Sequence, residues 1–217
     1  RGTAATAPDH SEVALSFEVN RTSCQALLES VPKALLPIVH QAKMAGVFAL
    51  SGRLAFDTRS FDDLTLDTKI EDECKMVAVP EDLAHERFSK PFTHRVVHPD
   101  GTLGEETTGP TSENWTPIGA ISPFMQVAVL TTEDGAFFRH KGFDHAAIRS
   151  SLAANLKSRK FVRGASTISM QLAKNLFLAR EKTLSRKLEE IVLTDYLEQV
   201  WGKEEIMELY LNVIEFG

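Results

Sequence analysis

The chain has 217 residues, of which 43% are hydrophobic and 25% charged, and its formal net charge is -6 at pH 7. These values are ordinary for one large or two small globular domains, and the net charge gives no reason to expect a polyanionic partner for the whole chain. No apolar stretch reaches the roughly 18–20 residues that span a bilayer, and the longest, Ala120 to Leu130, contains Pro123.

Alternating apolar residues make the amino-terminal half a strand-rich region. They predict strands over 13–19, 48–56 and 64–70, and a short apolar run covers 76–79. The first ten residues are small and polar, so we expect them to be disordered.

Helix and turn signals punctuate these strands. Thr22 and Ser23 offer an N-cap for a short helix from Cys24, which prolines at 32 and 37 interrupt. Pro99-Asp100-Gly101 marks a turn. Residues 102–116 are rich in Gly, Thr, Glu and Pro and predict a linker or long loop.

Cys24 and Cys74 are the two cysteines of the chain. In an oxidising compartment they could form a disulfide, whereas two unpaired buried thiols are the default in the cytosol. The residues alone leave both states open.

Helical periodicity dominates after Trp115. It predicts helices over 168–176, 184–200 and 206–213. Residues 120–217 carry 13 basic and 12 acidic side chains, but Arg149 to Lys187 holds ten basic residues and one acid. A nearly neutral segment argues against a nucleic-acid partner, so the basic block needs another explanation.

Two adjacent acids, Glu133 and Asp134, follow the apolar run Val127 to Leu130. An acid at the end of a buried segment is partly desolvated, which raises its pKa and suits it to general acid/base work. The alternative is a helix terminus whose acids face solvent, with Gly135 as the stop. The residues alone favour this alternative.

A second constellation runs from Gly164 to Asn175. Gly164 with Ser166 or Thr167 indicates a helix start, where free backbone N–H groups favour an anion. Gln171, Lys174 and Asn175 can share a face of the helix that follows. Plain N-capping and a solvated lysine would also explain these residues.

A third constellation holds Arg186 and Glu190, four residues apart. That spacing is usually a surface ion pair worth a few tenths of a kcal/mol, about 0.3. The alternative is an active-site carboxylate held among cations. Together the three constellations indicate a site for phosphate or pyrophosphate beside candidate acids.

In this order the constellations resemble the peptidoglycan glycosyltransferase family, the polymerase module of penicillin-binding proteins and of monofunctional transglycosylases. Glu-Asp-x-x-Phe-x-x-His-x-Gly matches from Glu133 to Gly142, and Gly-Ala-Ser-Thr-Ile-x-x-Gln-x-x-Lys-Asn matches from 164 to 175. Arg-Lys-x-x-Glu matches from 186 to 190, and Lys-x-x-Ile-x-x-x-Tyr-Leu-Asn matches from Lys203 to Asn212. Glu215-Phe-Gly is a short fifth match.

The strand pattern of the first half and the resemblance of the second together predict an α+β chain with two parts. Residues 1–115 form a strand-rich periplasmic extension of unknown role, loosely similar to those of AsmA proteins. Residues 116–217 form a mostly helical, lysozyme-like glycosyltransferase module, truncated at its carboxyl end.

The resemblance also implies a reaction, the polymerisation of lipid II into β-1,4-linked glycan by inverting transfer with release of undecaprenyl pyrophosphate. Glu133 would be the base and Glu190 a second essential carboxylate. The residues expected to bind substrate are Asp134, His140, Ser166, Thr167, Gln171, Lys174, Asn175, Lys182 and Arg186. No cofactor is required, although the resemblance allows a divalent cation, Mg²⁺ or Mn²⁺, near Glu190.

The implied location is the periplasmic face of the bacterial inner membrane, with any anchor outside this segment. Ala120 to Leu130 would then dip into the bilayer, unless it is a core helix. An oxidising location favours the Cys24–Cys74 disulfide more strongly than the residues alone do. The expected partners are lipid II, the growing glycan strand, the membrane surface, and transpeptidase and other cell-wall proteins that shape the cell.

Two rival functions stay open. A lysozyme-like lytic hydrolase also uses a Glu in a helical fold, but it would not need the basic block. A non-enzymatic protein that binds lipid or a periplasmic partner could carry a vestigial transferase half.

Overall fold

The computed structural model describes residues 1–7, 9–178 and 183–215. The chain divides into two compact units that interleave along the sequence. The first unit comprises Arg1–Ser30, Met44–Lys75 and Asp144–Ala165, and the second comprises Val31–Lys43, Met76–Phe143 and Ser166–Gly217. Strands dominate the first half of the chain and helices the second, as predicted. A module boundary near residue 115 stays a prediction.

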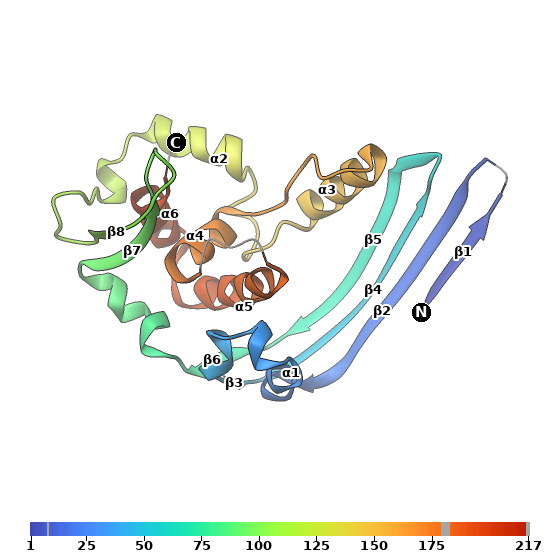
Figure 1. Cartoon of the computed structure of the whole chain (residues 1–217), viewed down its shortest axis with the longest axis horizontal. Helices are drawn as coiled ribbons and strands as arrows, with labels where there is room; N and C mark the ends of the chain where they lie inside the picture. The colour runs from blue at the N-terminus through green and yellow to red at the C-terminus, as the bar shows by residue number, and fades with distance from the viewer. Residues whose placement is uncertain (8, 179–182, 216–217) are drawn as a thin grey trace. The chain divides into compact units, whose positions relative to one another are not determined.

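The first unit is built on a four-stranded antiparallel sheet in the order β1-β2-β4-β5 (Figure 1). Its strands are β1 (Gly2–Thr6), β2 (Ser11–Ser23), β4 (Val47–Asp57) and β5 (Ser60–Asp72). Leu15 lies opposite Leu54, and Leu54 opposite Leu66, so the alternating apolar residues share one face. The three predicted strands are therefore confirmed. The predicted disorder of the first ten residues is wrong for Gly2–Thr6, because β1 pairs with β2 along its whole length.

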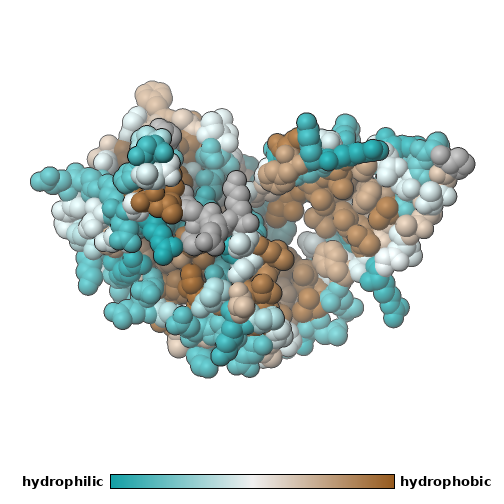
Figure 2. Space-filling view, in the orientation of Figure 1, coloured by the Kyte–Doolittle hydropathy of each residue, from teal (hydrophilic) through white to brown (hydrophobic). Residues whose placement is uncertain are grey.

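The helix α3 (His145–Ser158) packs beside β5 in the first unit (Figure 1). Lys157 Nζ lies 2.7 Å from Asp62 Oδ2, and hydrophobic side chains gather next to the helix (Figure 2). Asp144 caps the helix by accepting the N–H of Ala147 at 2.9 Å. Sequence periodicity did not predict α3, because its only buried residue is Ser151 and its apolar stripe is weak.

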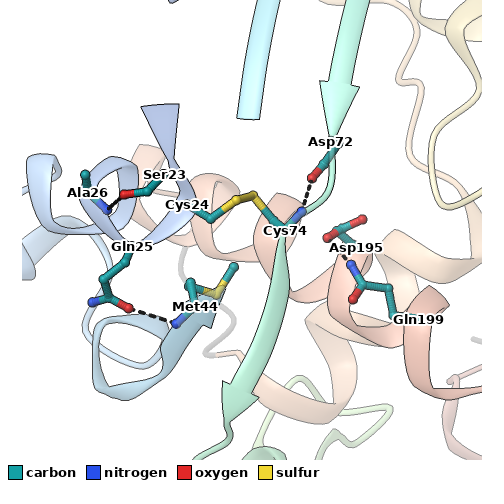
Figure 3. The surroundings of a disulfide bond; sticks show 9 residues. All are labelled: Ser23, Cys24, Gln25, Ala26, Met44, Asp72, Cys74, Asp195 and Gln199. Atoms are coloured by element: carbon teal, nitrogen blue, oxygen red, sulfur yellow. Dashed lines mark hydrogen bonds between the residues drawn. A yellow bond between two sulfur atoms is a disulfide. The ribbon is translucent and has the colours of Figure 1, made fainter. Parts of the chain in front are cut away.

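A disulfide joins Cys24 to Cys74 within the first unit, which settles the pairing that the sequence left open (Figure 3). Cys24 begins α1 (Cys24–Ser30), and Ser23 Oγ accepts the N–H of Ala26 at 3.1 Å as the predicted N-cap. The N–H of Cys74 donates to Asp72 Oδ1 at 3.0 Å. The bridge therefore ties the start of α1 to the segment that follows β5.

Four helices of the second unit contribute to its core. They are α2 (Pro123–Glu133), α4 (Ile168–Phe177), α5 (Leu184–Val200) and α6 (Lys203–Val213), of which the last three confirm predicted helices. Fully buried side chains meet at the centre: Phe137, Ile168, Leu172, Leu193, Leu197, Ile206 and Met207. Apolar residues three and four apart on α4, α5 and α6 thus supply the packing that the sequence predicted.

A β-hairpin in the second unit corrects another expectation. Its strands are β7 (Phe92–Val97) and β8 (Leu103–Thr108), and the predicted turn at Pro99-Asp100-Gly101 joins them. Gly101 has φ +84°, a conformation that favours glycine. Residues 103–108 are therefore a strand rather than part of a loop.

The remaining elements are short. They are β3 (Lys43–Ala45), β6 (Lys75–Ala78, at the apolar run of residues 76–79) and the 3-10 helices η1 (Lys33–Leu35), η2 (Val39–Gln41), η3 (Glu81–Leu83), η4 (His85–Ser89) and η5 (Ile118–Ala120).

The helix α2 exposes most of its apolar residues. Phe124 is 88% exposed and Val127 61%, while Val129 is buried. We expected Ala120 to Leu130 to form either a membrane surface or a core helix, and the apolar run before Glu133 to be buried. Burial is therefore wrong for most of these side chains. Among the described residues, no helix combines the length and the apolar character needed to cross a membrane.

Candidate active site

The end of α2 separates the two adjacent acids of the first motif. Glu133 is the last helical residue and is exposed, whereas Asp134 is the C-cap and is 6% exposed. The N–H of Asp134 donates to Leu130 O at 3.1 Å, so the backbone turns away from the helix at this point. The expectation that Glu133 is partly desolvated is therefore wrong. The neighbouring Asp134 is the acid that is buried.

Asp134 links the first motif to the start of α4. Its carboxylate lies 3.0 Å from His140 Nε2 and accepts the N–H of Ile168, the first residue of α4, at 3.1 Å. A carboxylate at a helix N-terminus is favoured by the free N–H groups and the helix dipole. Thr167 completes the start of α4: its Oγ1 accepts the N–H of Met170 at 3.2 Å and donates to Gly142 O at 2.6 Å. Asp134, His140 and Thr167 therefore hold two motifs together.

Glu133 is connected to a chain of polar side chains on other helices. Gln171 Nε2 on α4 donates to Glu133 Oε2 at 2.9 Å, and Gln171 Oε1 accepts from the Tyr210 hydroxyl on α6 at 3.3 Å. Burial, followed by the charges of Glu133 and Asp134, raises the pKa of Tyr210 to about 12. The phenol therefore stays a donor, and it fixes the Gln171 amide with its NH₂ group toward Glu133.

Glu190 is a buried carboxylate surrounded by cations. Its side chain is 3% exposed, its Oε2 accepts from Arg186 Nη1 at 2.7 Å, and its Oε1 accepts from Lys187 Nζ. Lys187 Nζ also lies 3.3 Å from Ser166 Oγ at the start of the second motif. Thr183 Oγ1 accepts the N–H of Arg186 at 3.1 Å and caps α5. The interpretation of Arg186 and Glu190 as an exposed surface ion pair is therefore wrong, because Glu190 is buried.

The fit of a divalent cation can be judged at Glu190. Both carboxylate oxygens already accept from cations, so the residues present do not fit a metal ion at this carboxylate. In the part of the chain that the structure describes, His10, Glu12 and Asp57 are the only group of three or more side chains with ligand atoms close enough to one another to share a metal ion. These belong to the first unit, and Arg59 already pairs with Asp57.

Two predicted binding residues lie further along α4. Asn175 is 4% exposed, and neither polar atom of its amide has a hydrogen-bond partner among the described residues. Lys174 is half-buried beside it. Lys182, also predicted to bind substrate, lies outside the described residues.

Sequence reasoning missed a second layer of contacts behind the first motif. Lys203 Nζ lies 4.3 Å from the centre of the Phe137 ring and 2.6 Å from Glu198 Oε1, which also accepts from Ser169 Oγ. Gly142 has φ +85°, and a Cβ there would lie 2.9 Å from Thr194 Cγ2. The fourth motif therefore supports the first, and only glycine fits at 142. Tyr210 belongs to the fourth motif, but its hydrogen bond to Gln171 could not be predicted from the sequence.

Known proteins match the second half of the chain in sequence. A family model described as Transglycosylase matches residues 100–217. A protein of Nitrosomonas eutropha named biosynthetic peptidoglycan transglycosylase is 52% identical over 103 residues, which are 48% of this chain and 42% of that protein.

Proteins with the same name give similar matches. The one from Nitrosospira multiformis is 47% identical over 117 residues, 54% of this chain and 51% of its own length. The one from Haemophilus influenzae is 48% identical over 104 residues, 48% of this chain and 42% of its own length. The chain thus spans about half the length of the curated relatives it matches. The family match also begins earlier than the motifs do, since it includes β8.

Proposed function

Since the chain belongs to the transglycosylase family, we propose that its second unit carries the site of a peptidoglycan glycosyltransferase that polymerises lipid II. The observation that supports this most is the exposed carboxylate of Glu133, held by Gln171, in one compact unit with the buried Glu190 and the two cations that pair with it, Arg186 and Lys187. An accessible base and a set of cations are the two parts that transfer from a pyrophosphate-linked donor requires.

Glu133 takes the proton from the 4-hydroxyl of the acceptor sugar. That oxygen attacks the anomeric carbon of the donor chain, and the bond from this carbon to the pyrophosphate oxygen breaks. The electron pair leaves with undecaprenyl pyrophosphate, and the proton stays on the Glu133 carboxyl. The displacement inverts an α-linked donor to a β-1,4 glycoside, so one base suffices.

The leaving group carries negative charge into a cationic environment. Arg186 and Lys187 lie against Glu190, and Lys174 and Lys182 are the further lysines that we assign to the pyrophosphate. Glu190 stabilises the two cations that it pairs with and holds them in place for the diphosphate. Charge that develops on the pyrophosphate is thereby stabilised without a metal at this carboxylate.

Gln171 positions the base. Its amide nitrogen donates to Glu133, and the buried Tyr210 hydroxyl prevents the amide from turning over. This bond holds the Glu133 carboxylate in one orientation. Ser166 and Thr167 lie at the start of α4, next to this pair.

A membrane-facing location suits the exposed side chains of α2. Phe124, Met125 and Val127 are exposed large hydrophobic residues on this helix. Such a surface can enter the acyl region of a bilayer beside a lipid-linked substrate. We assign this surface to the periplasmic face of the inner membrane, with transpeptidases and other cell-wall proteins as the class of partner.

The test is turnover by the full-length protein in lipid vesicles. With lipid II as substrate, we expect glycan polymer and released undecaprenyl pyrophosphate, both suppressed by a phosphoglycolipid inhibitor. Preformed peptidoglycan in a parallel reaction should remain undigested. Digestion without polymerisation would instead support the lytic hydrolase, and binding of lipid II without either reaction would support a vestigial site.

A further inference from the structure

The segment Lys33–Gln41 lies against α5 in the second unit. It contains η1 and η2, and it belongs to the strand-rich half of the chain although it packs with the helices. Ser185 Oγ donates to Leu35 O at 3.0 Å. Glu189 Oε1 accepts the N–H groups of Ile38 at 2.6 Å and Val39 at 3.1 Å. These bonds join residues about 150 positions apart in the sequence.

Glu189 is a second buried carboxylate next to Glu190. It is 3% exposed, and its hydrogen bonds to described residues come from backbone N–H groups rather than from lysine or arginine. A buried charge is costly unless hydrogen bonds compensate it. Two successive N–H groups at the start of a helical turn form a concavity that favours an anion. The N–H groups of Ile38 and Val39 therefore supply hydrogen bonds that compensate the buried charge of Glu189.

The bonds to this half of the chain fall on one stripe of α5. With about 100° between successive residues, the side chains of Ser185, Glu189 and Tyr196 point within about 40° of one another. The Tyr196 hydroxyl also donates to a backbone carbonyl, that of Leu83, at 3.0 Å. The cationic cluster of Arg186, Lys187 and Glu190 lies on the adjacent face of the same helix. Of the three residues on the stripe, Glu189 lies nearest to Arg186 around the helix, about 60° away, so its bonds act most directly on the direction of the cluster.

Arg186 has two acids within reach along the helix. Glu189 lies three residues on and Glu190 four, and both spacings allow an ion pair. In the structure Arg186 Nη1 bonds to Glu190, while Glu189 bonds to the backbone of Ile38 and Val39. We propose that Glu189 is a positioning residue: by binding these N–H groups it sets the rotation of α5, and with it the direction in which the Arg186–Glu190 pair faces the pyrophosphate. The inference rests on the proposed function and gives the segment 33–41 a role in it.

The experiment compares three variants of the full-length protein. Glu189→Ala removes the acceptor, Glu189→Gln keeps an acceptor oxygen, and Tyr196→Phe removes another bond to the same half of the chain, about two helical turns away. All are assayed for lipid II polymerisation at a temperature where thermal unfolding shows each to be folded. Inhibition by inorganic pyrophosphate measures the cationic cluster directly.

We expect Glu189→Ala to lower kcat at least tenfold and to weaken inhibition by pyrophosphate, with a smaller change in KM. Glu189→Gln should stay within about threefold of the wild type, and Tyr196→Phe within twofold even if its Tm falls. Unchanged kcat in Glu189→Ala overturns the proposal. Equal losses in Glu189→Ala and Tyr196→Phe at equal loss of Tm also overturn it, since they would indicate a general structural role.

Amide hydrogen exchange separates this inference from the proposed function. The N–H groups of Ile38 and Val39 should exchange slowly in the wild type and fast in Glu189→Ala. A wild type that makes no polymer contradicts the proposed function, whatever these amides do. A wild type that polymerises lipid II but leaves both amides unprotected contradicts the positioning role alone.

Discussion

Replacing Asp134 tests whether one buried carboxylate holds the first two motifs together. Asp134→Ala removes the acceptor for His140 Nε2 and for the Ile168 N–H, and both groups lie in a buried environment. Asp134→Asn keeps the shape and one acceptor oxygen but removes the charge. The matched control is Asp144→Asn, the same change at the N-cap of α3.

The expected losses in the free energy of unfolding follow from these contacts. A hydrogen bond to a charged group contributes about 1.5–3 kcal/mol, and breaking a buried charged network from one side costs about 3–5 kcal/mol. We therefore expect Asp134→Ala to lower the free energy of unfolding by about 3–5 kcal/mol and Asp134→Asn by about 1–2 kcal/mol. Asp144→Asn should cost less than about 0.5 kcal/mol, because asparagine and aspartate cap helices about equally well.

Urea unfolding measures this. It is followed by tryptophan fluorescence for Asp134, since Trp115 and Trp201 share its unit, and by circular dichroism for Asp144, which belongs to the first unit. Each variant should shift the midpoint without changing the slope. Asp134→Ala should also reduce polymerisation, because α4 carries Gln171. If Asp134→Ala costs no more than Asp144→Asn, the reasoning about this network is refuted.

Two further predictions concern the disulfide and the tyrosines. The bridge closes a loop with a sequence separation of 50. The double variant Cys24→Ser and Cys74→Ser should therefore lower the free energy of unfolding of the first unit by about 4 kcal/mol. Urea unfolding followed by circular dichroism measures this, and a loss below about 1 kcal/mol would contradict it. The pKa of Tyr210 is raised to about 12 and that of buried Tyr196 is also raised. The folded protein therefore keeps these phenols protonated where the unfolded chain ionises, and their contribution to stability is intact below pH 10 and lost as the pH rises toward 12. The chain has two tyrosines, which would both be half ionised at pH 10 if their pKa values were the ordinary 10. Absorbance at 295 nm should therefore show little tyrosinate near pH 10 in the folded protein, and half of the full signal there would contradict the burial of both rings.

Periodicity predicted the elements whose apolar residues recur on one face. The strands of the sheet and the helices α4, α5 and α6 follow patterns of two and 3.6 residues. β1 and β8 were missed since they are edge strands of small or polar residues, which only pairing with a neighbour orders. No local pattern in the sequence distinguishes such a strand from a loop.

The site shows a different limit. The motifs identified the acids and the cations, but adjacent acids have the same local pattern, and only the turn after α2 exposes Glu133 and buries Asp134. The contact of Tyr210 with Gln171 joins residues 39 positions apart, and that of Glu189 with Val39 joins residues 150 apart. Contacts at these separations depend on the packing of whole helices, so spacing rules for a single helix cannot predict them.

The central claim is that Glu133 is the base of a polymerising transferase, and Glu133→Gln in the full-length protein tests it most directly. Glutamine keeps the size of the side chain and an oxygen for the Gln171 amide, but it cannot take a proton at neutral pH. Glu204→Gln, at an exposed acid of α6, is the control for the loss of one charge. We expect Glu133→Gln to keep the wild-type Tm and lipid II binding and to lose polymerisation by at least about 100-fold, while Glu204→Gln stays active. Glycan chains made by Glu133→Gln at the wild-type rate would contradict the account.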